Sequence, residues 1–189
     1  MQNYPNIEKL ILASASPRRR ELLAALGLDF EVRIPNIDEQ LRGGETPSAY
    51  AERLAREKAA AIDAGPETVR IAADTIVVLG ESILGKPANE AEAFEMLTGL
   101  SGQMHKVITG VCVRDKQRTE VISVTTRVFF RTLAKEEISR YIASGCPMDK
   151  AGAYAIQGGA AHMVRKISGS YTNVVGLPLC EVHELLISF

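Results

Sequence analysis

The sequence predicts an α/β or α+β fold in which a mixed, twisted sheet is flanked by helices and arranged in two lobes. Strand and helix patterns alternate through the first half of the chain, as in βα units, and the second half contains an antiparallel hairpin pattern. With 189 residues, 46% hydrophobic and 24% charged, the chain is expected to fold as a single domain over residues 1–189 rather than stay disordered. A chain of this length buries about 70% of its extended surface.

The first half alternates strand and helix patterns. Lys9–Ala13 is a short apolar run that predicts a buried strand. Ser16 suits an N-cap and Pro17 the first helical position of a helix that reaches Leu26 and stops at Gly27. The other elements expected in this half are a strand over Phe30–Ile34, a polar stretch over Asn36–Glu45, a helix from Pro47 to about Ala64, and a strong strand over Val69–Leu79.

The second half begins with a turn at Gly80–Ser82 that leads into a short strand at Ile83–Leu84. Two β-rich runs, Val107–Arg114 and Glu120–Phe130, are joined by the polar residues Asp115–Arg118, which predicts an antiparallel hairpin. The remaining expected elements are helices over Glu90–Leu97, Lys135–Ala143 and Leu179–Leu186, and short strands over Ala151–Ile156 and Met163–Ile167.

Charge and composition exclude several classes of protein. A formal net charge of −1 argues against a protein that coats nucleic acid, and no apolar run approaches the ~20 residues of a membrane span. The three cysteines, Cys112, Cys146 and Cys180, are odd in number and contain no CxxC pair, so neither a disulfide framework nor a zinc site is expected. Met1–Pro5 lacks the basic start of a signal peptide, and an intracellular, reducing location is therefore expected.

The first helix opens with three consecutive cations, Arg18, Arg19 and Arg20. The positive end of the helix dipole disfavours each of them by about 0.3–1 kcal/mol. A bound polyanion would remove this conflict, because backbone N–H groups at a helix start and guanidinium groups together bind phosphate. The alternative is that the arginines extend into water beside Glu21.

Lys58 falls inside the apolar arc of the second helix, which includes Tyr50, Leu54, Ala61 and Ile62. A lysine in this position either extends its ammonium past the rim to water or directs it into a cleft to meet an anion. The sequence leaves both possibilities open.

Asp74 lies in the middle of the strongest strand, where an unpaired carboxylate costs several kcal/mol. Catalytic acids and bases often occupy such positions, but a structural ion pair with a nearby lysine is the alternative. Lys86 follows just beyond the next hairpin and is the natural candidate to face the same cavity as Asp74.

Two further polar residues are candidates. Glu39 is a loop carboxylate suited to Mg²⁺, which binds through one or two carboxylates plus phosphate oxygens, although a solvated loop acid is the alternative. Gln157 lies between glycine-containing stretches and could hydrogen-bond the edge of a base. The chain offers no activated serine or cysteine nucleophile, so these residues suit metal-assisted hydrolysis of a phosphoanhydride by water.

Blocks along nearly the whole chain resemble the signature motifs of Maf-like proteins. They are Leu10–Leu23, Ala55–Ala59, Ala73–Thr75, Gly85–Pro87, Leu100–Gly102, Asp149–Tyr154 and Lys166–Pro178. The resemblance implies a Maf/ITPase-like fold with a cleft between its two lobes. It also implies a nucleoside triphosphate pyrophosphatase that is cytoplasmic, commonly homodimeric and dependent on a divalent cation, Mg²⁺ or Mn²⁺.

The resemblance also implies roles for individual residues. Asp74 corresponds to the proton acceptor that activates water, and with Glu39 it would hold the metal. The residues around phosphate are Ser14, Arg19, Lys58 and Lys86, and those that set base choice are Arg18, Thr75 and Gln157. Arg18 together with Asp149–Tyr154 and Ile156–Gly158 resembles the subgroup that hydrolyses dTTP and UTP, with Ala155 as a small departure from a position where relatives often carry glycine.

A second class of function stays open from the sequence. A non-catalytic nucleotide- or nucleic-acid-binding regulator of cell division and septum formation would need only the cations. The five Phe, five Tyr and absent Trp make stacking platforms for nucleic acid scarce, so no nucleic-acid partner is expected. Asp74 in a buried strand favours the enzyme.

Overall fold

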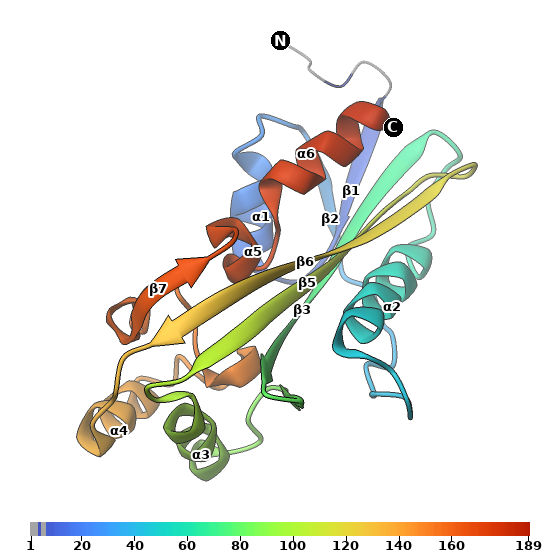
Figure 1. Cartoon of the computed structure of the whole chain (residues 1–189). Helices are drawn as coiled ribbons and strands as arrows, with labels where there is room; N and C mark the ends of the chain where they lie inside the picture. Colours follow the sequence, from blue (N-terminus) through green and yellow to red (C-terminus); the bar gives the residue numbers. More distant parts are fainter. Residues whose placement is uncertain (1–3, 5–6) are drawn as a thin grey trace. The chain divides into compact units, whose positions relative to one another are not determined.

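The computed structural model describes Tyr4 and residues 7–189, so most of the stretch on which the signal-peptide expectation rests lies outside the described residues. The described strands form one seven-stranded mixed sheet in the order β2-β1-β3-β5-β6-β7, with β4 paired to β3 (Figure 1). The strands are β1 (Lys9–Ala13), β2 (Glu31–Arg33), β3 (Thr68–Leu79), β4 (Ser82–Leu84), β5 (Met104–Arg114), β6 (Thr119–Phe130) and β7 (Val164–Ser168). The helices are α1 (Pro17–Ala24), α2 (Pro47–Ala60), α3 (Glu90–Leu100), α4 (Lys135–Ala143), α5 (Tyr171–Val175) and α6 (Leu179–Ser188).

The chain divides into two compact units. The first comprises Met1–Asp74, Thr109–Val124 and Gly176–Phe189, and the second comprises Thr75–Ile108 and Thr125–Val175. Strands β3, β5 and β6 each contribute residues to both units. The single domain over residues 1–189 and the cleft expected between lobes stay predictions.

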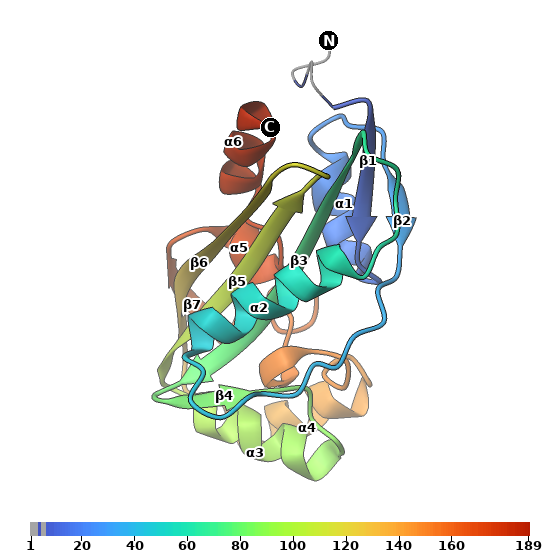
Figure 2. The ribbon, with the colours of Figure 1, turned by 90° about the vertical axis from the view of Figure 1, so that its right-hand side faces the viewer.

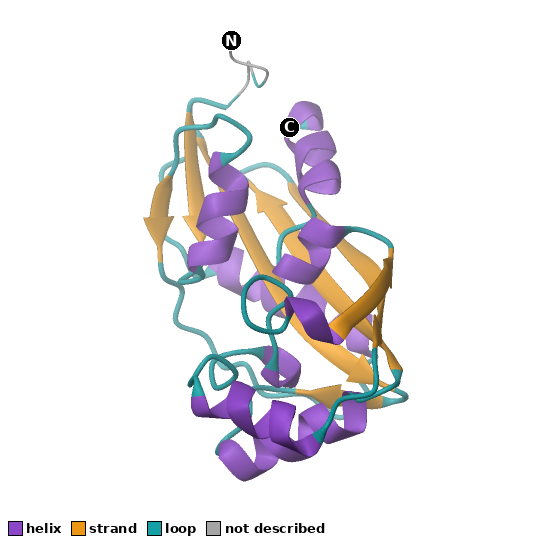
Figure 3. Cartoon of the chain, turned by 90° about the vertical axis from the view of Figure 1, so that its left-hand side faces the viewer, coloured by secondary structure: helices purple, strands orange, loops and turns teal. Residues whose placement is uncertain are grey.

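In the first unit, the alternation of side chains along each strand supplies two apolar faces. Leu10 and Leu12 of β1 belong to a core cluster with Leu23 of α1 and Val182 of α6. On the opposite face, residues of β1, β3 and β5 pack with Ala55 and Ala59 of α2. Helices α1 and α6 therefore cover one face of these strands and α2 covers the other, as the views from either side show (Figures 2 and 3).

Parallel and antiparallel pairs coexist in the sheet. Strand β1 pairs in parallel with both β2 and β3, whereas β3–β4 and β6–β7 are antiparallel. In the second unit, α3 packs against α4 and against a 3₁₀ turn over Ala151–Ala153. The prediction of a mixed sheet flanked by helices is confirmed.

Two elements, β1 over Lys9–Ala13 and α4 over Lys135–Ala143, have the predicted boundaries. Ser16 caps α1 and Pro17 is its first residue, as predicted. Helix α2 ends at Ala60, four residues before the predicted end, and the short helix α5 was not predicted.

The predicted strand over Ala151–Ile156 is wrong. Gly152 and Ala153 have φ values of 67° and 58°, in the left-handed region that a strand cannot contain. A Cβ on Gly152 would lie 2.9 Å from Cγ1 of Val77, so glycine lets this turn approach β3 closely. The nearby strand β7 begins at Val164, one residue after its predicted start, because Met163 ends a second 3₁₀ turn.

Among the described residues, no helix is long and apolar enough to cross a membrane.

The close approach of β5 to α2 gives a stability prediction. A Cβ on Gly110 would lie 2.3 Å from the carbonyl oxygen of Ala51, so Gly110→Ala must push the helix away from the sheet. We expect Gly110→Ala to lower the free energy of unfolding by about 1–3 kcal/mol or more, measured by urea denaturation. Gly99→Ala, in helix α3, is the matched control. A Cβ on Gly99 would lie 3.5 Å from Cδ2 of Leu79, which is an ordinary van der Waals contact. The control should be neutral or stabilising by up to about 1 kcal/mol, and equal losses in both variants would contradict the argument.

Candidate functional site

Asp74 faces helix α2. Ala72 belongs to the core cluster beneath α2, and Asp74, two residues further along β3, therefore points to the same side of the sheet. Asp74 is only 8% exposed. A carboxylate at this depth requires a partner of opposite charge or several hydrogen bonds.

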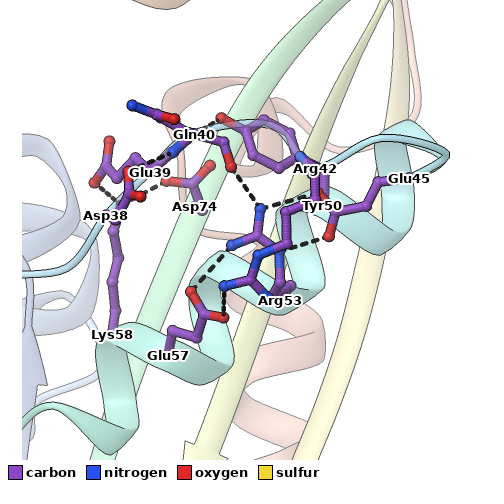
Figure 4. Close-up of polar contacts among 10 residues, drawn as sticks. All are labelled: Asp38, Glu39, Gln40, Arg42, Glu45, Tyr50, Arg53, Glu57, Lys58 and Asp74. Atoms are coloured by element: carbon purple, nitrogen blue, oxygen red, sulfur yellow. Dashed lines mark hydrogen bonds and ion pairs between the residues drawn. The ribbon is translucent and has the colours of Figure 1, made fainter.

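The partner of Asp74 is Lys58, which is also 8% exposed. Its Nζ lies 2.6 Å from Oδ1 of Asp74 and 2.7 Å from Oε1 of Glu39 (Figure 4). The lysine therefore does not extend past the rim to water, and the ion pair considered as the alternative for Asp74 is present. The same ammonium contacts both the buried aspartate and the carboxylate of Glu39, a loop residue whose side chain is 49% exposed.

Ser14 and Arg19 lie at the carboxyl end of β1. Leu12 is in register with Ile71 of the parallel strand β3, so Ser14 lies near the level of Ala73. The buried Oγ of Ser14 accepts hydrogen bonds from the backbone N–H of Ser16 at 3.1 Å and from Nη1 of Arg19 at 3.4 Å. In open α/β sheets, ligands bind at this end of the strands.

Arg19 is held by the backbone as well. Its Nε donates to the carbonyl oxygen of Gly176 at 2.8 Å, which fixes the direction of the guanidinium. Burial lowers the pKa of Arg19, and the positive charge of Arg18 lowers it further. The negative charges of Asp74 and Glu39 act in the opposite direction and raise this pKa. The arginine predicted at the phosphate therefore lies within electrostatic range of both carboxylates.

At the start of helix α1, serine hydroxyls accept hydrogen bonds from some of the backbone N–H groups. Oγ of Ser16 accepts from the backbone N–H of Arg19 at 3.4 Å, and Oγ of Ser14 accepts from that of Ser16. Two of the N–H groups expected to face an anion therefore already have partners. Arg18 is half-buried and Arg20 is exposed, so the three cations predicted to act together have different surroundings.

Glu39 and Asp74 fit a divalent cation of the magnesium type. Their oxygens bind one ammonium, and they offer only hard carboxylate ligands. In the part of the chain that the structure describes, no group of three or more His, Cys, Asp or Glu side chains is placed to hold a metal. Two carboxylates suffice for Mg²⁺ or Mn²⁺ only where phosphate oxygens complete the coordination.

The loop that carries Glu39 is attached to α2 by residues that the sequence analysis did not select. Tyr50 and Arg53 hydrogen-bond to the backbone of Glu39 and Gln40 (Figure 4). The sequence places Tyr50 in an apolar arc and gives no sign of a role for its hydroxyl. The spacing of Arg53 and Glu57, four residues apart on one helix, was an available signal for an ion pair.

Three predicted site residues, Thr75, Lys86 and Gln157, belong to the second unit. Thr75 and Gln157 are half-buried and Lys86 is exposed. The segment that precedes Lys86 is joined to the turn at Gly152, whose N–H donates to the carbonyl oxygen of Gly85 at 2.9 Å. Within this unit, the motif containing Lys86 and the motif leading to Gln157 are therefore neighbours.

A buried aromatic cluster supports the segment leading to Gln157. Nε2 of His105 lies 2.7 Å from the hydroxyl of Tyr154, and both rings pack edge to face with Phe130. Burial lowers the pKa of His105 to about 4. The ring is therefore neutral in the folded protein at pH 7, with Nδ1 buried and without a hydrogen bond.

This cluster predicts a loss of stability in mild acid. Because the pKa of His105 is lower in the folded state than its ordinary 6.5, the unfolded chain binds the extra proton between pH 6.5 and pH 4. We expect protonation of His105 to remove about 2 kcal/mol of unfolding free energy between pH 7 and pH 5. His105→Gln, which can still bond Tyr154, should lose correspondingly less in urea denaturation at the two pH values. An identical loss in the two proteins would exclude His105 as the cause.

Comparisons with known proteins show the family of this chain. The sequence profile of the family described as "Maf-like protein" matches residues 9–189. A "dTTP/UTP pyrophosphatase" of Geobacter sulfurreducens is 57% identical over 179 residues, which cover 93% of this chain and 94% of the relative. A protein of the same name from Vibrio cholerae is 51% identical over 185 residues, covering 97% of this chain and 99% of the relative.

Among solved structures, a HAM1 protein from Coxiella burnetii superposes with a TM-score of 0.50 at 16% sequence identity, over 96% of this chain and 99% of that one. At this identity the likeness concerns the fold alone, and it agrees with the ITPase-like architecture expected. With a family profile that extends over almost the whole chain and relatives that are more than half identical, this chain belongs to the Maf-like protein family.

Proposed function

We propose that this protein is a nucleoside triphosphate pyrophosphatase that hydrolyses dTTP and UTP to the nucleoside monophosphate and pyrophosphate. The observation that carries the proposal is the contact of one buried ammonium, that of Lys58, with the carboxylates of Asp74 and Glu39, with Arg19 within electrostatic range. The names of the relatives from Geobacter sulfurreducens and Vibrio cholerae support the reaction and the substrate class.

Asp74 would accept the proton of the attacking water. Its Oδ1 is bonded to Lys58, so we assign the proton to Oδ2, and the water attacks the α-phosphorus as the bond to the β-phosphate breaks. The burial of Asp74 fixes the carboxylate in one orientation. A positioned general base contributes about 10²–10⁴-fold to the rate.

Lys58 and Arg19 would neutralise the negative charge that grows on the departing pyrophosphate, with Lys86 as a third cation. The direction of Arg19 is set by Gly176 and Ser14 before substrate arrives, so little reorganisation is needed. Removing one preorganised donor of this kind typically costs about 3–4 kcal/mol of transition-state stabilisation.

A divalent cation, Mg²⁺ or Mn²⁺, would be held by Glu39 and Asp74 together with phosphate oxygens, and when bound it supplies positive charge that polarises the phosphate groups. Base choice would depend on Arg18, Thr75 and Gln157. The amide of Gln157 can donate and accept at once, which suits the edge of a pyrimidine ring.

The cellular setting follows from the family resemblance. We propose a cytoplasmic homodimer without a nucleic-acid partner. The net charge of −1 supports the last point, because nonspecific binding to nucleic acid depends on a positive surplus.

The alternative function is a regulator that binds nucleotide without cleaving it. In such a protein, a buried carboxylate beside the cations would weaken nucleotide binding, because a carboxylate repels phosphate. The names of the relatives favour the enzyme. Release of pyrophosphate from UTP with Mg²⁺ or Mn²⁺ would distinguish them, since the regulator would bind UTP and release nothing.

Asp74→Asn gives the direct test of the proton acceptor. The amide keeps the shape and can still accept a hydrogen bond from Lys58, so the variant should fold and bind UTP. We expect kcat to fall about 10²–10⁴-fold, measured as pyrophosphate released from UTP.

Glu120→Gln is the matched control, because Glu120 pairs with Arg118 at the surface of the same unit. This variant should retain the wild-type kcat. Normal turnover in Asp74→Asn would remove Asp74 from the mechanism.

The role of Gln157 predicts a specificity change. Wild-type protein should hydrolyse UTP and dTTP with a higher kcat/KM than ATP and GTP in a pyrophosphate-release assay. Gln157→Ala should lose most of that preference, because a buried base edge left without its partner costs about 1–3 kcal/mol, or roughly 5–150-fold. Equal rates for purine and pyrimidine triphosphates in the wild-type protein would contradict the assignment.

A further inference from the structure

Residues 34–46, between β2 and α2, contain no helix or strand, and Glu39 is exposed within them. No ladder of backbone hydrogen bonds therefore sets the position of this carboxylate. Its contact with Lys58 depends on whatever holds the loop.

Two side chains of α2 hold the backbone at this point. The hydroxyl of Tyr50 donates to the carbonyl oxygen of Glu39 at 2.6 Å, and Nη2 of Arg53 donates to the carbonyl oxygen of Gln40 at 2.9 Å (Figure 4). Because the two residues are three apart on one helix, both point toward the loop. The bonds fix consecutive carbonyl groups, one of them in the residue that carries the carboxylate.

Arg53 is itself held rigidly. Its Nε lies 2.5 Å from Oε1 of Glu45 and its Nη1 lies 3.0 Å from Oε2 of Glu57, and its side chain is 13% exposed. The hydrogen bond from Arg53 lowers the pKa of Glu45 to about 2, so this pair stays charged throughout the neutral range. The far end of the loop is therefore fastened to the same guanidinium.

The Tyr50 side chain is partly buried, and its hydroxyl donates a hydrogen bond to the loop. The guanidinium carbon of Arg53 also lies 5.4 Å from the centre of the Tyr50 ring, so the two side chains support each other.

From these contacts we infer that Tyr50 and Arg53 are positioning residues that hold the Glu39 carboxylate in place for the divalent cation of the reaction. The inference rests on the proposed function, in which Glu39 is a cation ligand. Neither residue is assigned a contact with the cation or the nucleotide. Their effect is to reduce the conformational freedom that Glu39 must lose when the cation binds.

The test measures cation binding directly. Wild-type protein and variants are saturated with α,β-imido-UTP, which cannot be hydrolysed at the reacting bond, and titrated with Mn²⁺ while free Mn²⁺ is followed by electron paramagnetic resonance. Tyr50→Phe should weaken Mn²⁺ binding about 2–10-fold, the effect of losing one hydrogen bond. Arg53→Gln should weaken it about 10-fold or more, because the bonds to Gln40 and Glu45 are lost together.

Arg42→Gln is the matched control. Arg42 belongs to the same ionic network, but its side chain is 62% exposed and its guanidinium bonds Glu57 at the surface. This variant should bind Mn²⁺ within 2-fold of wild type. In steady-state assays, excess Mn²⁺ should restore the kcat of Tyr50→Phe, and binding of the nucleotide without metal should not change.

The outcomes separate the two proposals. If Glu39→Gln loses Mn²⁺ affinity while Tyr50→Phe and Arg53→Gln keep it, the positioning role is wrong and the role of Glu39 stands. If Glu39→Gln binds Mn²⁺ like wild type, the cation role of Glu39 is wrong and the positioning role falls with it. If wild-type protein releases no pyrophosphate, the proposed function fails, whereas the Mn²⁺ titrations still decide the role of Tyr50 and Arg53. A loss of kcat that excess Mn²⁺ does not restore in a folded Tyr50→Phe would also overturn the inference.

Discussion

The ammonium of Lys58 is the interaction on which the candidate site depends. It lies under helix α2 with both Asp74 and Glu39 within 2.7 Å. Without it, Asp74 would be a buried carboxylate with a second carboxylate nearby, and the two negative charges would repel each other. The lysine therefore permits two negative charges to lie close together beside the middle of β3, and two such charges can share a cation.

The balance of charge explains why a triphosphate would need a cation here. Lys58 and Arg19 provide two positive charges, and Asp74 and Glu39 provide two negative ones. A triphosphate that entered this balanced group alone would meet two carboxylates that repel it. Under the proposed function, a divalent cation held by Glu39 and Asp74 would remove that repulsion, and the lysine and the arginine would act on the leaving group. Glu39 would then link substrate binding to cation binding.

The sequence predicted the parts of the fold that local chemistry controls. Strand β1 and the start of α1 follow from an apolar run, a serine cap and a proline in the first turn, all within nine residues. Lys58 and Asp74 were selected because each contradicts its apolar surroundings. The sequence could not predict that Lys58 and Asp74 pair with each other, because the pairing depends on which face of β3 packs beneath α2.

Other features depend on conformations and contacts that residue types do not reveal. The apolar letters of Ala151–Ile156 suit a strand, but left-handed φ angles at Gly152 and Ala153 turn the chain instead. A helical wheel places Tyr50 on an apolar face and gives no sign that its hydroxyl reaches a loop eleven residues earlier. In the second unit, the sequence proposed Lys86 from its place after a hairpin and Gln157 from its place between glycine-containing stretches, and only the resemblance gave these two residues specific roles.

Helix α2 contacts both Asp74 and the loop that carries Glu39. Lys58 near its end contacts the buried aspartate, while Tyr50 and Arg53 in its first two turns hold the loop of Glu39. The height of this helix above the sheet is set by Gly110, where the absence of a side chain lets the backbone of Ala51 approach β5. A small displacement of α2 would therefore change the reach of Lys58 and the position of Glu39 together. A rigid helix packed closely on a sheet can hold a loop carboxylate with the precision that a cation requires, which the loop alone could not provide.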